Sequence, residues 1–385
     1  MIAAPTHRLM LSLAPLALLV ACTDSRDLPS APTAAVPASR FSAERAIAPS
    51  PRGTLQMVHD PLRDLLYLVG GLGPVPCQDL ACGNALIDDL WSFNPRSRTW
   101  TEISDQLPPR IGDASALDYR SRRIINYQPY FNSEIATWAY DLDKGTWENR
   151  HPALEPPGRW GSMAVYDSRS DRVLLFGGAD LSTNAPLNDL WAYDYETNTW
   201  TERHPPVGPP PRQWHALVYV PTIQRTLLFG GTDPSDGSVL NDTWAYDYRR
   251  DRWTELRPRG APSPRMGHYM AFEPRTNRLV LFGGFLSGFY EQVTGDTWIY
   301  DVATNRWQQT FPQESPSPRF GHVMSRTNGS VVLFGGGPTV PGYTNQTFLY
   351  DSRANTWREV GAEESAGREQ AAVLGKARGG PLRVR

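Results

Sequence analysis

The fold is decided by residues 159–200, which read RWGSMAVYDSRSDRVLLFGGADLSTNAPLNDLWAYDYETNTW. In this stretch an apolar run ends in the paired glycines Gly177 and Gly178. Tyr193 follows the second glycine after 15 residues, and Trp200 follows Tyr193 after seven. The unit returns about every fifty residues, and a period of that length with paired glycines and spaced aromatics indicates a repeat architecture.

Six copies of the unit can be traced along the chain. Each copy begins at an arginine, and these are Arg52, Arg110, Arg159, Arg212, Arg265 and Arg319. Five copies contain the paired glycines, at 70–71, 177–178, 230–231, 283–284 and 335–336, whereas the second copy has Gln128 and Pro129 there. Every copy carries a tryptophan near its end, and these are Trp100, Trp147, Trp200, Trp253, Trp307 and Trp357.

The apolar and aromatic residues of each copy follow the period of two that is typical of strands. Each copy supplies four short strands joined by turns, which predicts an all-β protein. A single four-stranded sheet leaves both faces wet, whereas sheets packed around an axis bury them. The paired glycines suit a sharp turn or the close approach of another backbone.

The paired glycines, the Tyr-Asp step, the fixed tryptophan and the Arg-x-Gly-His start resemble kelch repeats over about residues 52–360. The resemblance implies a kelch-type β-propeller, for which six four-stranded blades are favoured. Arg368 stands where a seventh copy would begin, so seven blades with an incomplete last blade are the alternative. We expect residues 1–21 to form a signal peptide, 22–50 a tether and 51–385 the propeller.

The first 22 residues are expected to direct export. An apolar run from Leu9 to Val20 is too short to span a bilayer as a helix. It ends in Leu-Val-Ala-Cys at Cys22, which resembles the bacterial lipobox, and the alternative is an ordinary cleaved signal. This predicts lipidation of Cys22 and a place in the bacterial cell envelope, on the outer membrane. Residues 23–50 are rich in Ala, Pro and Ser, as in flexible tethers.

Charge and cysteine content narrow the function classes. The formal net charge is −2, so no general attraction to nucleic acid is expected. Besides Cys22 the chain has Cys77 and Cys82, which would form a disulfide outside the cytoplasm or remain two thiols. No catalytic, metal or cofactor motif is found, so no cofactor is expected.

Two sets of repeated residues are candidates for ligand binding. The six start arginines would ring one mouth of the channel and bind carboxylates or sulfates, or would instead cap carbonyls and pair with acidic residues. Their recurrence favours the structural role. Three histidines, each three residues after a start arginine, form either a metal or acid/base cluster or bonds to neighbouring strands: His215, His268 and His322.

Aromatic residues in the loops after the paired glycines are the remaining candidates. Phe289, Tyr290 and Tyr343 would be exposed for sugar stacking or protein contact, or would fold back over the blades. We therefore expect a monomeric, lipid-anchored binding or scaffolding module for an envelope glycan or protein. The alternative is a carbohydrate-active enzyme that resembles exported sialic acid mutarotases of the kelch type, an analogy at the level of the fold.

Overall fold

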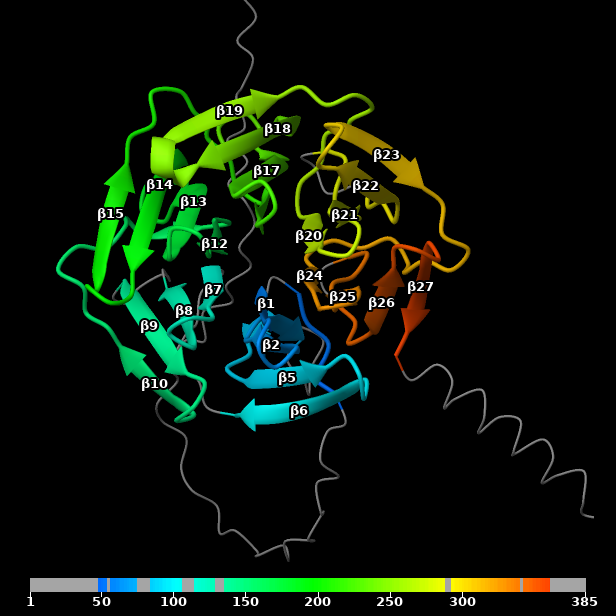
Figure 1. Cartoon of the computed structure of the whole chain (residues 1–385), viewed down its shortest axis with the longest axis horizontal. Helices are drawn as coiled ribbons and strands as arrows, with labels where there is room; N and C mark the ends of the chain where they lie inside the picture. Colours follow the sequence, from blue (N-terminus) through cyan, green and yellow to red (C-terminus); the bar gives the residue numbers. More distant parts are fainter. Residues whose placement is uncertain are drawn as a thin grey trace, which may run out of the picture.

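The computed structural model describes residues 48–53, 56–74, 84–105, 114–128, 135–287, 292–339 and 342–360. These residues form a ring of six antiparallel sheets around a central axis (Figure 1). Each sheet is a blade of four strands in sequence order, so the prediction of six four-stranded blades is confirmed. In the described part of the chain no helix is long and apolar enough to cross a membrane.

The first three blades run from residue 56 to residue 203. Blade 1 consists of β1 (Gln56–Asp60), β2 (Leu65–Val69), β5 (Leu90–Asn94) and β6 (Thr99–Ser104), with the hairpin β3 (Leu72–Pro74) and β4 (Asn84–Leu86) inserted. Blade 2 consists of β7 (Ala114–Asp118), β8 (Arg123–Gln128), β9 (Ala136–Asp141) and β10 (Thr146–Asn149). Blade 3 consists of β12 (Met163–Asp167), β13 (Arg172–Asp180), β14 (Pro186–Asp194) and β15 (Thr199–Arg203), with β11 (Arg159–Trp160) beside β13.

The last three blades repeat the same plan. Blade 4 consists of β16 (Ala216–Val220), β17 (Arg225–Thr232), β18 (Val239–Asp247) and β19 (Arg252–Leu256), with the short helix η1 (Tyr248–Arg250) between the last two strands. Blade 5 consists of β20 (Tyr269–Glu273), β21 (Arg278–Phe282), β22 (Thr297–Asp301) and β23 (Arg306–Thr310). Blade 6 consists of β24 (Val323–Arg326), β25 (Val331–Phe334), β26 (Thr347–Asp351) and β27 (Thr356–Glu359).

The seven-residue spacing between tyrosine and tryptophan follows from the outer hairpin of each blade. In blade 3 the register places Tyr193 directly opposite Trp200, and their ring centroids lie 5.0 Å apart. The Tyr193 hydroxyl donates to Asn198 in the turn at 2.7 Å. Asn198 has φ +54°, a left-handed conformation that Asn tolerates better than most residues. The spacing thus reports one tight turn between two strands.

The tryptophans also join one blade to the blade before it. The indole of Trp200 in blade 3 donates to Thr137 in blade 2 at 2.8 Å. In the same way Trp100 in blade 1 donates to Thr347 in blade 6 at 2.9 Å. The second contact closes the ring, since it joins the first blade to the last. The inner strands β1 and β24 also contact each other.

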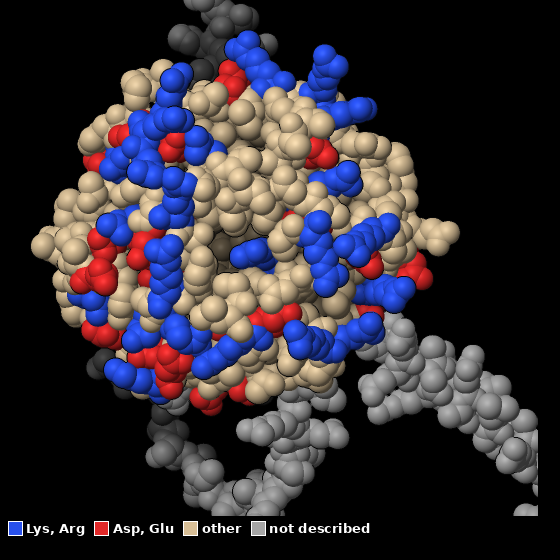
Figure 2. All heavy atoms as spheres, in the orientation of Figure 1, with Lys and Arg blue, Asp and Glu red and all other residues tan. Residues whose placement is uncertain are grey.

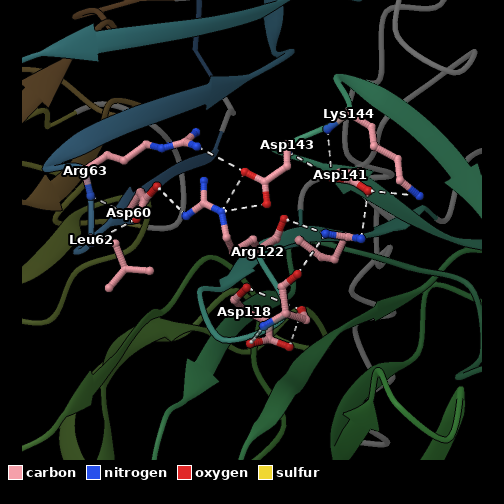
Figure 3. A network of polar contacts seen from close by, with 10 residues as sticks. Asp60, Leu62, Arg63, Asp118, Arg122, Asp141, Asp143 and Lys144 are labelled. Carbon is pink, nitrogen blue, oxygen red and sulfur yellow. Dashed lines mark hydrogen bonds and ion pairs between the residues drawn. The ribbon is translucent and has the colours of Figure 1, made fainter.

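A polar network ties the turns of blades 1 and 2 together (Figure 3). Arg122 donates to Asp60 at 3.3 Å and to Asp143 at 2.9 Å and 3.0 Å. Arg63 also donates to Asp143, at 3.1 Å. Asp60 is fully buried and also accepts from the backbone N–H of Leu62, so the network holds a buried carboxylate between two blades.

Candidate functional site

The described start arginines lie in the joints between blades. Five of them are 0% exposed, namely Arg52, Arg159, Arg212, Arg265 and Arg319. In blade 4 Arg212 donates to both oxygens of Asp242, at 2.6 Å and 2.7 Å, and to the carbonyl of Gly230 at 3.0 Å. Arg159 and Arg265 make the same contacts with Asp189 and Asp296. The described start arginines therefore cap carbonyls and pair with acidic residues, which was the structural alternative to ligand binding.

The joint also uses the backbone of the arginine. The carbonyl of Arg265 accepts from Gly231 of the preceding blade at 2.9 Å. A side chain on Gly230 would place its Cβ 2.7 Å from that carbonyl, so the expected close approach of another backbone is confirmed here. The carbonyl of Arg52 accepts from Gly336 at 2.9 Å, which makes the joint between blades 6 and 1 equivalent to the others.

Blade 6 departs from the other described joints in its polar partners. Arg319 donates to the amide oxygen of Gln346 at 2.9 Å, where the other described joints have an aspartate. Its guanidinium lies 5.1 Å from the ring centre of Phe348, where those blades have a tryptophan. Burial without a carboxylate in contact lowers the pKa of Arg319 to about 10. Phe348 has no N–H group to donate. This fits the change from aspartate to Gln346, because the amide does not need an indole N–H to complete its hydrogen bonds.

One position of the repeat forms a row of backbone hydrogen bonds across blades 3 to 6 at the channel mouth. Trp214 N–H donates to the Gly161 carbonyl at 2.9 Å, Gly267 to Trp214 at 3.0 Å, and Gly321 to Gly267 at 3.1 Å. All four residues have positive φ, from +53° at Trp214 to +67° at Gly161. Three of them are glycine, for which this conformation is easy. Trp214 is a bulky residue held in a strained conformation, and such strain clusters at functional sites.

Trp214 helps to form an apolar cup at this mouth, which we name the cup. The cup has a volume of about 120 Å³. Its walls are the aromatic residues Trp214, Tyr269, Phe285 and Phe320. Trp160 stands beside the rim, with its ring centroid 5.2 Å from that of Trp214, and both indoles are partly exposed. A cup of this kind can take up one apolar or aromatic group.

The three predicted histidines line the cup, but the exposed fraction of each is at most 2%. Each ring packs edge-on against a phenylalanine of the preceding blade, with centroids 5.4 Å apart for Phe176 and His215. Neither ring nitrogen of His215 has a hydrogen-bond partner among the described residues, whereas His268 and His322 lie against the backbone of Phe229 and Phe282. No group of three or more His, Cys, Asp or Glu side chains that could hold a metal occurs in the described ranges.

The same burial keeps the histidines neutral in the folded protein. Burial, followed by the nearby charge of Arg212, lowers the pKa of His215 to about 3. Burial and then Arg319 lower the pKa of His322 to about 3. For His268 burial, then Arg265 and the other two histidines, lower the pKa well below the ordinary value. The imidazoles are therefore uncharged donors and acceptors beside an apolar cup.

We expect the folded protein to lose stability as the pH falls below 6.5. The unfolded chain binds protons on these histidines near the ordinary pKa of 6.5, whereas folded His215 binds one only near 3. The free energy of unfolding is therefore highest above pH 6.5 and declines toward pH 3. Between pH 7 and pH 5 it falls by about 2 kcal/mol per histidine. Urea unfolding at the two pH values measures this change.

The matched variants are His215→Gln and His204→Gln, since the His204 side chain is 76% exposed. His215→Gln should reduce the difference in unfolding free energy between pH 7 and pH 5, and His204→Gln should leave it as in the wild type. An equal pH dependence in all three proteins would show that the buried imidazoles do not cause it.

A plug of three side chains closes the channel below the cup. Tyr269 donates to the amide oxygen of Gln56 at 2.9 Å, and the Gln56 amide nitrogen lies 3.7 Å from the Met163 sulfur. These residues begin the inner strands of blades 5, 1 and 3. The equivalent residues of blades 2, 4 and 6 are Ala114, Ala216 and Val323. Large and small side chains thus alternate around the ring, which lets three blades meet at its axis.

The loop aromatic Tyr343 folds back, as the second alternative for it predicted. It is 8% exposed and belongs to a buried cluster with Met266, Phe285 and Phe320. A Cβ on Gly53 would lie 2.5 Å from its ring, so Tyr343 also packs against the start of blade 1. The other predicted positions lie outside the described residues: Arg110, Phe289, Tyr290, Cys22, Cys77, Cys82 and the possible seventh start at Arg368.

Trp214 is the site residue that sequence reasoning missed. Its signal is visible when the starts of the copies are aligned, because RWGS, RQWH, RMGH and RFGH differ at the third position. Only the second of these replaces the glycine with a large residue. The plug has a weaker signal, since Gln56, Met163 and Tyr269 share only their place at the start of an inner strand.

A comparison with protein families supports the repeat assignment. Residues 126–261 and 223–377 match the model of the KLHDC2/KLHL20/DRC7 Kelch-repeats domain. Together these two matches cover more than half of the chain.

Three curated plant proteins are similar to part of the chain. Adagio protein 3 of Arabidopsis thaliana is 30% identical over 225 residues, which are 55% of this chain and 35% of that protein. Adagio-like protein 3 of Oryza sativa subsp. japonica is 29% identical, over 55% of this chain and 34% of its own length. An F-box/kelch-repeat protein of Arabidopsis thaliana is 28% identical, over 52% and 45%. The chain thus spans less than half the length of these relatives.

Proposed function

Because the chain belongs to the kelch-repeat family, we propose that it is a protein-binding module whose cup receives an apolar or aromatic side chain of a partner. One observation carries this proposal. Trp214 occupies a strained, left-handed position that is glycine in the blades on either side, and it does so at the rim of the cup. A residue that costs stability and lines a pocket is better explained by binding than by folding.

The chemistry of the cup supports a side chain as the ligand. Its volume of about 120 Å³ is close to that of a cavity that holds one benzene molecule. Trp and Tyr are the residues that dominate binding energy at protein interfaces, where they fill desolvated pockets. The imidazoles of His215 and His268 at the cup wall are neutral, so they bring no charge to the cup.

The variant Trp214→Gly tests the proposal. It restores the glycine that four of the other five copies have at this position. Relief of strain and loss of packing should therefore nearly cancel in the unfolding free energy, each about 1 kcal/mol. Peptides selected from a random displayed library on the immobilised wild-type protein serve as the probe. Their affinity for Trp214→Gly should fall by about 30-fold, as for a hot-spot tryptophan.

The control is Phe311→Ala, which removes an aromatic side chain that is 78% exposed. It should leave the affinity within about twofold of the wild type. Peptides that bind wild type and Trp214→Gly equally would show that the cup is not the binding site.

A second candidate ligand is a glycan of the cell envelope. It is favoured by the partly exposed indoles of Trp160 and Trp214, which form a platform of the kind that stacks on sugar rings. Retention of a glycan by the wild type, and its loss in Trp160→Ala while selected peptides still bind, would favour this candidate.

We also propose that the module is held at the bacterial cell envelope by lipid on Cys22. The support is the apolar run up to Val20 and the Leu-Val-Ala-Cys sequence that ends at Cys22. In bacterial expression of the full chain, the wild type should sediment with membranes and incorporate labelled palmitate, and Cys22→Ala should do neither. A wild-type protein that stays in the supernatant without label would contradict lipidation.

A further inference from the structure

The plug leaves a second chamber on the opposite side of the channel, which we name the turn-side chamber. It has a volume of about 160 Å³ and lies among the inner strands of all six blades. The fourth residue of each inner strand lines it, and these residues are His59, Leu117, Tyr166, Tyr219, Phe272 and Arg326. Figure 2 shows a hollow at the centre of the molecule with a basic side chain at its edge.

Arg326 is the exception at its repeat position. The equivalent residues of the other blades are apolar or aromatic, apart from His59. It is also the one Lys or Arg among the described residues that line the chamber. The turn that follows it does not require the arginine, because Thr327 accepts the N–H groups of Gly329 and Ser330 at 3.0 Å and 2.9 Å.

The charge of Arg326 is not matched by a partner in contact. In the described ranges no carboxylate or other acceptor lies within hydrogen-bond distance of its guanidinium, and Asp64 acts on it only through space. By contrast Arg172 and Arg225, which begin the second strands of blades 3 and 4, bind Asp194 and Asp247 at 2.6 Å and 2.8 Å. Arg326 is partly buried, and this burial lowers the pKa of its guanidinium.

The neighbouring groups hydrogen-bond to one another and not to Arg326. The Nε2 atom of His59 lies 3.1 Å from a carboxylate oxygen of Asp64, and Asp64 also accepts from the Asn328 N–H at 2.8 Å. Burial first, and then the charge of Arg326, lower the pKa of His59 to about 4, so His59 is neutral near pH 7. Among the residues that line the chamber, Arg326 therefore carries the one fixed charge near pH 7, and the carboxylate of Asp64 lies behind His59.

We propose that the turn-side chamber binds a small monocarboxylate with a compact ring, such as benzoate. Guanidinium pairs with a carboxylate through two parallel hydrogen bonds, and this pairing is strong where water is excluded. Tyr119 and Tyr166, with ring centroids 5.2 Å apart, and Phe272 supply walls for the ring. A volume of about 160 Å³ is close to that of a cavity known to hold benzene.

Calorimetric titration of the full chain with benzoate and benzamide tests this site. The two probes have the same shape, but only benzoate is charged. Wild-type protein should bind benzoate at least tenfold more tightly than benzamide. Arg326→Gln should lose at least tenfold in benzoate affinity and bind benzamide as before. The matched control Arg275→Gln, on the exposed turn of blade 5, should bind benzoate as the wild type does.

Three results would overturn the proposal: no heat of binding with 10 mM benzoate, equal affinity for the two probes, or unchanged benzoate affinity in Arg326→Gln. The comparison of probes on the wild type decides the question even where the variant fails to fold. Trp214→Gly should leave benzoate binding intact, because the plug separates the chamber from the cup. Failure of this site therefore leaves the proposed protein-binding role untouched.

Discussion

Replacement of Arg212 by alanine is expected to lower the free energy of unfolding by about 3–5 kcal/mol. The guanidinium is 0% exposed, and it binds Asp242 through two hydrogen bonds and the Gly230 carbonyl through a third. Burial alone would raise the pKa of Asp242, but the hydrogen bonds and charge of Arg212 outweigh it and lower the pKa. Without Arg212 the carboxylate keeps only the Trp244 indole N–H at 2.7 Å among these contacts, and the Gly230 carbonyl loses the guanidinium.

The matched control for this prediction is Arg257→Ala. Arg257 also pairs with a carboxylate, that of Glu255 at 3.2 Å, but its side chain is 86% exposed. An exposed pair contributes about 0–1 kcal/mol, so urea unfolding should scarcely distinguish this variant from the wild type. If Arg212→Ala were equally stable, the arginine would be available for the ligand-binding role that the sequence also allows.

Replacement of Gly283 by alanine is expected to cost about 2–5 kcal/mol, for two separable reasons. The residue has φ +66°, which costs an L-residue about 1–2 kcal/mol. The added Cβ would also lie 2.5 Å from the carbonyl oxygen of Arg319, which is backbone and cannot rotate away. Displacing the joint adds the cost of overpacking, about 1–3 kcal/mol.

Gly237→Ala separates these two causes. Gly237 has φ +74°, but a Cβ there meets nothing within 4 Å. This variant should therefore show the conformational cost alone, about 1–2 kcal/mol. Thermal and urea unfolding of both variants give the difference. Equal losses would mean that the close approach of the next blade is not what requires glycine at Gly283.

The repeat made most of the fold predictable, because its signals are local. Tyr193 and Trp200 face each other across one turn, so their spacing is fixed within a single hairpin. The paired glycines indicated a close backbone, and the Arg212 carbonyl lies 2.7 Å from a Cβ built on Gly177. Six blades followed from counting such units.

The candidate site was less predictable because it depends on departures from the repeat and on contacts across the ring. Trp214 breaks the pattern at one position, which averaging over the copies conceals. Gln56 and Tyr269 are 213 residues apart in sequence, and only closure of the ring brings them together. Arg326 stands out only once the strands show which residues share its position.

The way the ring closes has a consequence for how such a protein can be rearranged. Each blade is built from one continuous stretch of chain, and the contact of Arg52 with Gly336 repeats that of Arg265 with Gly231. Within the described chain, the joint between blades 6 and 1 therefore needs no strand from another segment to close the ring. A circular permutant cut between two other blades would retain every joint, and whole blades are natural units for duplication and exchange.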